Sequence, residues 1–237
     1  MDTSSTSPFA LHEACRQGNL SLAEQLIKDA PNQANVADQD GRLPIHWATS
    51  SNNAAIVRLL SELRGFDPDV QDESGWSPLM IAANVQDSEE VLAILLRKDA
   101  DVNQKNYNGQ TALHLVASKN RLDVARTLLS HDPPASPRLR DKRGQYPIHR
   151  AAAVGSTPMI TLLLEHKSPL DATDSAGYTA LHHAIAEGHG DAAVTLLKAG
   201  CDSAKRDRDG LLAIDLAPDK EVRRYIQRMA ESEGIEL

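Results

Sequence analysis

The stretch GQTALHLVA, residues 109–117, is the clearest copy of a pattern that recurs along the whole chain. The pattern reads glycine, any residue, a small residue, Pro or Ala, Leu or Ile, His, any residue, Ala. Its leading glycine returns at steps of 33 to 35 residues, at Gly41, Gly75, Gly109, Gly144, Gly177 and Gly210. A further copy near the start lacks only the glycine, and the histidine place is filled in turn by His12, His46, Met80, His114, His149, His182 and Asp215. A fixed period of this length indicates an array of helical repeats.

Each period has the features of two helices preceded by a tight turn. In the copy that begins at Gly109, Thr111 can cap a short inner helix, and apolar residues from 122 to 129 recur at helical spacing in a longer outer helix. An aspartate three residues before most hairpin glycines suggests a turn in which its carboxylate binds backbone N–H groups, as at Asp38, Asp72, Asp141, Asp174 and Asp207. The sequence therefore predicts an all-α solenoid of seven helix-turn-helix repeats with hairpin-like fingers, capped at both ends.

The repeats account for nearly the whole chain. They occupy residues 9–37, 38–71, 72–104, 105–140, 141–173, 174–206 and 207–237. We therefore expect a single domain over 9–237, preceded by a flexible N-terminus at 1–8. The proline-rich segment SHDPPASPRLRD, residues 130–141, lengthens one connection, and we expect a stiff, exposed bulge there.

The composition excludes several classes of partner. A formal net charge of −8 argues against general affinity for nucleic acid or anionic membranes, since phosphate neutralisation needs clustered Lys and Arg. No run of about 18 apolar residues is present to span a bilayer. We expect a soluble, intracellular protein that is monomeric by itself. Cys15 and Cys201 belong to distant repeats, so we expect no disulfide between them.

The repeated histidines do not form a catalytic or metal-binding motif. Their fixed place in successive repeats favours a structural role, in which the imidazole bonds groups around the neighbouring turn. His12 and Glu13 do not complete an HExxH motif because residue 16 is arginine, and His183 with Glu187 lacks further ligands. The cysteines show no CxxC spacing, and no phosphate-binding loop is present. We predict no catalytic residue, no metal and no cofactor.

The residue after each hairpin glycine is expected to face a concave surface made by the fingers and the inner helices. These residues are Arg42, Trp76, Gln110, Gln145, Tyr178 and Leu211. Exposed Trp and Arg are enriched among interface hot spots, which favours Trp76 as a partner contact. For Trp47, on the inner helix of the second repeat, packing and partner contact are equally open.

Charged residues divide along the chain. The early fingers carry the acidic residues Asp38, Asp40, Asp72 and Glu73, and the fourth and fifth repeats carry the basic residues Lys119, Arg121, Lys142, Arg143 and Arg150. Charge runs usually form solvated faces, and single exposed ion pairs contribute only about 0 to 1 kcal/mol. A bipolar surface instead orients a partner and speeds its association.

The motifs resemble a known family. GQTALHLVA (109–117), GYTALHHAI (177–185) and GWSPLMIAA (75–83) resemble the ankyrin repeat. The longer stretches DQDGRLPIHWA (38–48), DESGWSPL (72–79), ASKNR (117–121) and HRAAAVG (149–155) resemble gankyrin-like proteins and their fungal counterparts, seven-repeat chaperones of proteasome assembly.

That resemblance implies a non-catalytic protein of the cytoplasm and nucleus. It implies a role in assembling the base of the proteasome regulatory particle, by binding the C-terminal domain of one AAA ATPase subunit along the concave surface. The residues matching Arg42 and Lys119 belong to the ATPase contact in that family. The animal proteins have an LxCxE stretch, and the residues of this chain that align with its Leu, Cys and Glu are His183, Ile185 and Glu187. Only the glutamate is kept, so retinoblastoma binding is not expected. The alternative is an ankyrin-repeat adaptor for another protein, such as a kinase or a ubiquitin-ligase component.

Overall fold

The computed structural model describes residues 8–237, and the secondary structure of that range is helical apart from one bridge pair, Arg206 with Leu212. The inner helices are α1 (Ala10–Gln17), α3 (Pro44–Ser50), α5 (Pro78–Asn84), α7 (Ala112–Ser118), α9 (Pro147–Ala153) and α11 (Ala180–Ala186). The outer helices are α2 (Leu20–Asp29), α4 (Ala54–Ser61), α6 (Glu89–Leu96), α8 (Leu122–Ser130), α10 (Thr157–Glu165) and α12 (Gly190–Lys198). Two 3-10 turns, η1 (Pro31–Asn35) and η2 (Ala213–Leu216), and the last helix α13 (Lys220–Ser232) complete the described chain. The predicted all-α architecture is confirmed, whereas most of the expected flexible N-terminus, residues 1–7, lies outside the described range.

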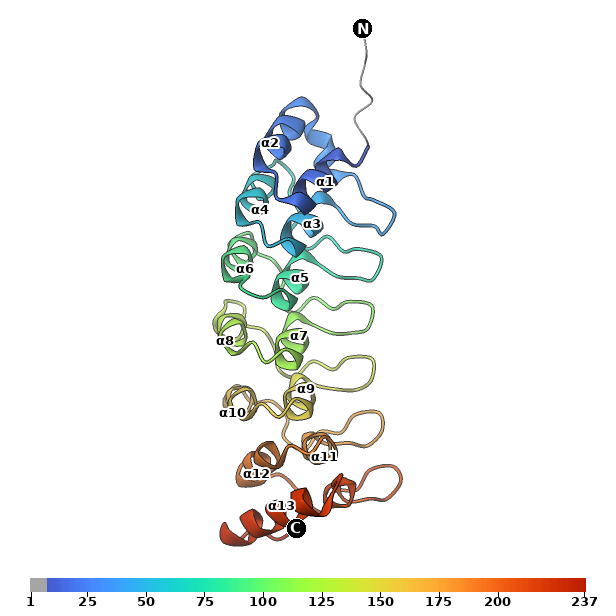
Figure 1. Cartoon of the computed structure of the whole chain (residues 1–237), viewed down its shortest axis with the longest axis vertical. Coiled ribbons are helices and arrows are strands. Elements are labelled where there is room, and N and C mark those ends of the chain that lie inside the picture. Colours follow the sequence, from blue (N-terminus) through green and yellow to red (C-terminus); the bar gives the residue numbers. More distant parts are fainter. Residues whose placement is uncertain (1–7) are drawn as a thin grey trace. The chain divides into compact units, whose positions relative to one another are not determined.

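The helices group into two compact units, the first ending at Tyr107 and the second beginning at Asn108. In unit 1, α3 packs between α1 and α5, and α4 packs between α2 and α6. In unit 2, α9 packs between α7 and α11, and α10 between α8 and α12, with η2 against α11 and α13 against α12. Within each unit the fingers extend from the inner helices, and the outer helices lie on the other side (Figure 1). The expected single domain over 9–237 stays a prediction.

Aliphatic side chains and alanines build both cores, as the low aromatic content requires. Ile56, Leu79 and Leu92 are almost fully buried in unit 1, and Leu113 and Leu163 are fully buried in unit 2. The alanines of the inner helices are buried too, and their small side chains allow the helices to pack closely.

The repeated histidines tie each inner helix to the next repeat. In unit 1, the backbone N–H of Leu43 donates to Nδ1 of His46 at 3.0 Å, and Nε2 of His46 donates to the carbonyl of Val70 at 3.2 Å. In unit 2, His114 and His149 make the same two kinds of contact. Since Nδ1 accepts a backbone N–H, each ring is neutral and carries its proton on Nε2. The imidazole thus satisfies the helix start at Leu43, where the sequence offers no capping hydroxyl.

Successive fingers are joined by backbone hydrogen bonds. The amide of Glu73 donates to the carbonyl of Asp40 at 3.0 Å in unit 1. In unit 2, the amide of Ser175 donates to Arg143 at 2.8 Å, and that of Arg208 donates to Ala176 at 3.1 Å. These bonds fix the spacing of the finger tips and therefore of the side chains on them.

The proline-rich segment, residues 130–141, is less exposed than the sequence suggested. Ala135 is 2% exposed, and its amide donates to the carbonyl of Leu128 at 2.9 Å. Arg138 donates through Nη1 to the carbonyl of Lys167 at 2.9 Å. The prediction of an exposed bulge is wrong for Ala135 and Pro137, which are buried because the segment folds back on α8.

Candidate partner-binding surface

The finger aspartates hold the turns together with one carboxylate oxygen each. Oδ1 of Asp38 accepts the amides of Asp40 at 3.0 Å and Arg42 at 2.9 Å. Oδ1 makes the same pair of bonds at Asp72, Asp141, Asp174 and Asp207. The predicted turn chemistry is confirmed, and these carboxylates are part of the scaffold.

In unit 1 the second carboxylate oxygens link residues that we expected at a partner surface. Nε of Arg42 donates to Oδ2 of Asp72 at 3.2 Å, and the Arg42 guanidinium lies 5.1 Å from the centre of the Trp47 ring. The Trp47 indole N–H in turn donates to Oδ2 of Asp38 at 2.7 Å. Burial raises the pKa of Asp38, but the Trp47 indole and the backbone amides stabilise its charge and bring the pKa below the ordinary value.

These contacts correct two expectations. The carboxylate side chain of Asp72 is 4% exposed, so it is not available as a surface charge for a partner. Arg42 is half-buried and neutralises Asp72, and Trp47 is half-buried with its N–H already engaged. The position of the Trp47 side chain is therefore explained in large part by packing within the repeats. A substitution of Arg42 would disturb the fold as well as any interface.

Unit 2 repeats this arrangement with other donors. Arg150 donates through Nη2 to Oδ2 of Asp141 at 2.7 Å, with the Asp141 side chain 2% exposed. Oδ2 of Asp174 accepts from Gln145 Nε2 at 3.1 Å and lies 2.9 Å from His183 Nε2. The guanidinium of Arg150 is therefore neutralised by the aspartate of its own repeat, and it adds less to the expected basic patch than its formal charge suggests.

Fewer charged side chains are exposed than the sequence indicated, but the exposed ones are still acidic in the early fingers and basic in the fourth and fifth repeats. In unit 1, Asp40 and Glu73 are exposed on finger tips. In unit 2, Lys142 and Arg143 are exposed on a finger tip and Lys119 at the turn after α7, while Arg121 is half-buried. Unit 1 thus presents acidic tips and unit 2 presents a basic one.

Three aromatic side chains lie on or near the fingers. Trp76 and Tyr178 are half-buried, and the Tyr178 ring stacks on His182 with 5.4 Å between ring centres. Tyr107, which we did not select from the sequence, is 57% exposed at the finger tip of the fourth repeat. Its place two residues before the hairpin glycine was visible in the period, because the equivalent residues in other repeats are polar or charged.

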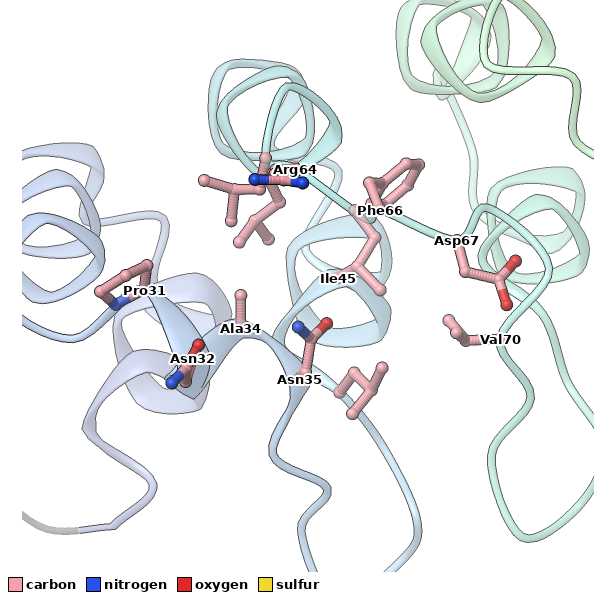
Figure 2. Close-up of a pocket in the computed structure, with 12 residues that line it drawn as sticks. Pro31, Asn32, Ala34, Asn35, Ile45, Arg64, Phe66, Asp67 and Val70 are labelled. Carbon is pink, nitrogen blue, oxygen red and sulfur yellow. The ribbon is translucent and has the colours of Figure 1, made fainter.

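Two hollows occur in unit 1. The first, of about 280 Å³, lies between the η1 region and the loop after α4, and Figure 2 shows Ala34, Ile45, Phe66 and Val70 around it. Its lining contains a single carboxylate, from Asp67, and no histidine, cysteine or serine, so it offers no general base with a nucleophile. The second, of about 710 Å³, borders the first finger and is lined by Phe9, His12, Asp38, Asp40 and Trp47 among others.

The described residues contain neither a metal-binding cluster nor a membrane-spanning helix. Among residues 8–237, no cluster of three or more His, Cys, Asp or Glu side chains could hold a metal ion. Over the same residues, no helix is long and apolar enough to cross a membrane. Both cysteines are free, and burial raises the pKa of each thiol to about 12.

The raised thiol pKa values predict slow alkylation. At pH 8, iodoacetamide should modify Cys15 and Cys201 of the folded chain about a thousandfold more slowly than the same residues in guanidinium chloride, because the thiolate is the nucleophile and burial suppresses it. Intact mass after timed quenching measures both rates. Rapid addition of one equivalent to the folded chain would show a reactive cysteine instead.

Comparisons with known proteins match this geometry. The family model for ankyrin repeats in three copies matches residues 2–72, 61–140 and 133–207. A protein of Saccharomyces cerevisiae described as probable 26S proteasome regulatory subunit p28 is 38% identical over 224 residues, covering 92% of this chain and 97% of its own. An ankyrin repeat-containing protein of Schizosaccharomyces pombe is 36% identical over 230 residues, covering 96% and 97%.

Solved structures agree. The ankyrin repeat domain of Bcl-3 superposes with a TM-score of 0.77 at 26% identity, covering 94% of this chain and 99% of that domain. The human ASB11 ankyrin repeat domain gives 0.81 at 22% identity, covering 92% and 96%, and supports the fold alone. The chain therefore belongs to the ankyrin-repeat family, and its similarity to yeast p28 over nearly the whole length confirms the gankyrin-like resemblance.

Proposed function

We propose that this protein is a non-catalytic chaperone for assembly of the base of the proteasome regulatory particle. In this role it binds the C-terminal domain of one AAA ATPase subunit through the fingers and the inner helices. The observation that carries the proposal is the similarity to the yeast proteasome regulatory subunit p28, which extends over 92% of the chain and is not confined to single repeats.

The exposed charges of each unit support a partner with a divided surface. The acidic tips at Asp40 and Glu73 favour basic side chains, and the basic group of Lys119, Lys142 and Arg143 favours acidic ones. Exposed charges contribute little affinity singly, but together they raise the association rate and penalise a reversed partner.

Binding to isolated ATPase domains tests the proposal. The C-terminal domain of each of the AAA ATPase subunits is titrated into the chain by calorimetry. We expect one of them to bind with a dissociation constant of micromolar or tighter. If none forms a complex at micromolar concentration, the proposal is wrong; affinity capture that recovers a kinase or ligase component instead would favour the adaptor alternative.

Charge reversal at exposed positions should slow association. The double variant Lys119→Glu and Lys142→Glu is expected to lower the association rate with the ATPase domain by about tenfold at low salt, and the difference should shrink at high salt. The matched control reverses Lys28 and Arg224, two exposed residues on α2 and α13. Equal rates for both double variants, measured by stopped flow, would remove the electrostatic argument.

Under the same proposal, the protein is a monomer by itself and acts in the cytoplasm and nucleus. Light scattering after gel filtration should give the chain mass of 25.7 kDa. Fluorescence microscopy of the tagged protein, with fractionation as a check, tests the location; exclusion from either compartment would contradict it.

A further inference from the structure

The second oxygen of the finger aspartates receives a side-chain donor in four of the five fingers that have an aspartate. The donors come from two places only. Trp47, Arg150 and His183 stand nine residues after the aspartate, on the inner helix of the same repeat. Arg42 and Gln145 follow the glycine of the preceding finger.

The last finger breaks this pattern. Oδ1 of Asp207 accepts the amides of Asp209 and Leu211, each at 2.9 Å, as in the other four fingers that have an aspartate. Oδ2 of Asp207 is buried and has no hydrogen-bond partner, although the residue as a whole is 7% exposed. Among residues 8–237 it is the one carboxylate oxygen in that condition.

The sequence explains why no donor reaches it. The place nine residues after Asp207 is taken by Leu216, and the place after the preceding finger glycine is taken by Tyr178. Leu216 is aliphatic, and the Tyr178 ring stacks on His182. Two arginines flank Asp207 in the chain: Arg206 donates through Nη1 to the carbonyl of Gly210 at 2.7 Å, and Arg208 is exposed on the finger tip.

We propose that the last finger is a binding site for a cationic side chain, an arginine or a lysine, which bonds Oδ2 of Asp207 when the side chains that cover this atom move aside. The cation makes to Oδ2 the bond that Arg42 and Arg150 make in other fingers. It belongs to the partner, so the site deepens the proposed function and rests on it for the identity of that partner.

The surroundings suit such an occupant. A buried carboxylate without a partner is unfavourable, and a charge-assisted hydrogen bond from a guanidinium or ammonium group relieves it. Leu211, which is 42% exposed, can cover the aliphatic stem of an arginine or lysine. In unit 2 this finger therefore adds an anionic contact to a surface that carries exposed basic side chains at Lys142, at Arg143 and, on the last finger itself, at Arg208.

A small cation tests the site without any partner protein. N-acetyl-arginine amide is titrated into the ¹⁵N-labelled full chain and followed by NMR, with N-acetyl-citrulline amide as the uncharged control. We expect the amides of Asp209 and Leu211 to shift with millimolar affinity for the arginine compound and at least tenfold more weakly for the citrulline compound. Asp207→Asn should weaken arginine binding at least tenfold; asparagine is native to the matching place in the fourth repeat, at Asn106, so the turn is expected to persist.

A second variant supplies the donor from within the chain. Tyr178→Arg places an arginine where Arg42 stands in the second repeat, and it should abolish the shifts by filling the site. Shifts that are absent in the wild type, centred elsewhere, equal for citrulline, or unchanged in either variant would overturn the inference. If the arginine compound binds at Asp207 but no ATPase domain binds the chain, the site is supported and the proposed function is wrong. If an ATPase domain binds but the arginine compound does not bind at Asp207, the proposed function is supported and the site is wrong.

Discussion

Replacing Gly177 with alanine is expected to lower the free energy of unfolding by about 3 kcal/mol. Gly177 has φ of +85°, a conformation that costs an alanine about 1 to 2 kcal/mol. A Cβ at this position would also lie 2.8 Å from the amide nitrogen of Arg208, which donates the hydrogen bond that joins the last two fingers. Moving that finger away adds a cost comparable to overpacking, about 1 to 3 kcal/mol.

The last repeat provides a matched control. Gly210 has φ of +81°, but no atom lies within 4 Å of the place its Cβ would take, because no further finger follows. Gly210→Ala is therefore expected to lose only the backbone contribution, about 1 to 2 kcal/mol. Urea unfolding followed by circular dichroism compares the two variants. Equal losses would show that contact between fingers contributes no measurable stability.

Acidification is expected to destabilise unit 2 through His149. Burial, followed by the neighbouring His183, lowers the pKa of His149 to about 4. The unfolded chain therefore binds the proton more readily than the folded chain, so stability is full above pH 6.5 and is lost as pH falls toward 4. Between pH 7 and pH 5 this single group should remove about 2 kcal/mol. His46 and His182 have pKa values lowered by burial as well and act in the same direction.

The chain suggests a replacement that separates His149 from other acid effects. Methionine occupies the same register at Met80, which is 1% exposed. His149→Met removes the titrating group and loses the two hydrogen bonds, so it should be less stable at pH 7 but less sensitive to acid by about 2 kcal/mol. Native-state hydrogen exchange at pH 7 and pH 5 measures the difference. An unchanged pH dependence would mean that His149 is not protonated on unfolding in this range.

The period alone made the architecture predictable. Glycine, proline and histidine recur at one register because each serves a local need: a left-handed turn, a first helical turn, and a bond to the helix start. The structural role of His46 could be inferred in the same way, since its contacts lie within its own repeat and the next one.

The surface was harder to predict because its contacts join residues far apart in sequence. Arg42 and Asp72 are 30 residues apart, and nothing local indicates that the arginine is neutralised by that aspartate. For Trp47 the sequence favoured neither packing nor partner contact, and only the structure shows that its indole N–H bonds Asp38. The missing hydrogen-bond donor at Oδ2 of Asp207 could be recognised only after the donors in the other fingers were known.

Association with the ATPase domain in the presence of salt tests the central claim most directly, that the exposed finger charges select a partner. The association rate of the wild-type chain with the bound C-terminal domain is measured from about 50 to 500 mM salt. We predict a steep fall for the wild type and a shallow one for the Lys119→Glu and Lys142→Glu variant, with the rates converging at high salt. A salt-independent rate that is identical for the two proteins would contradict the account.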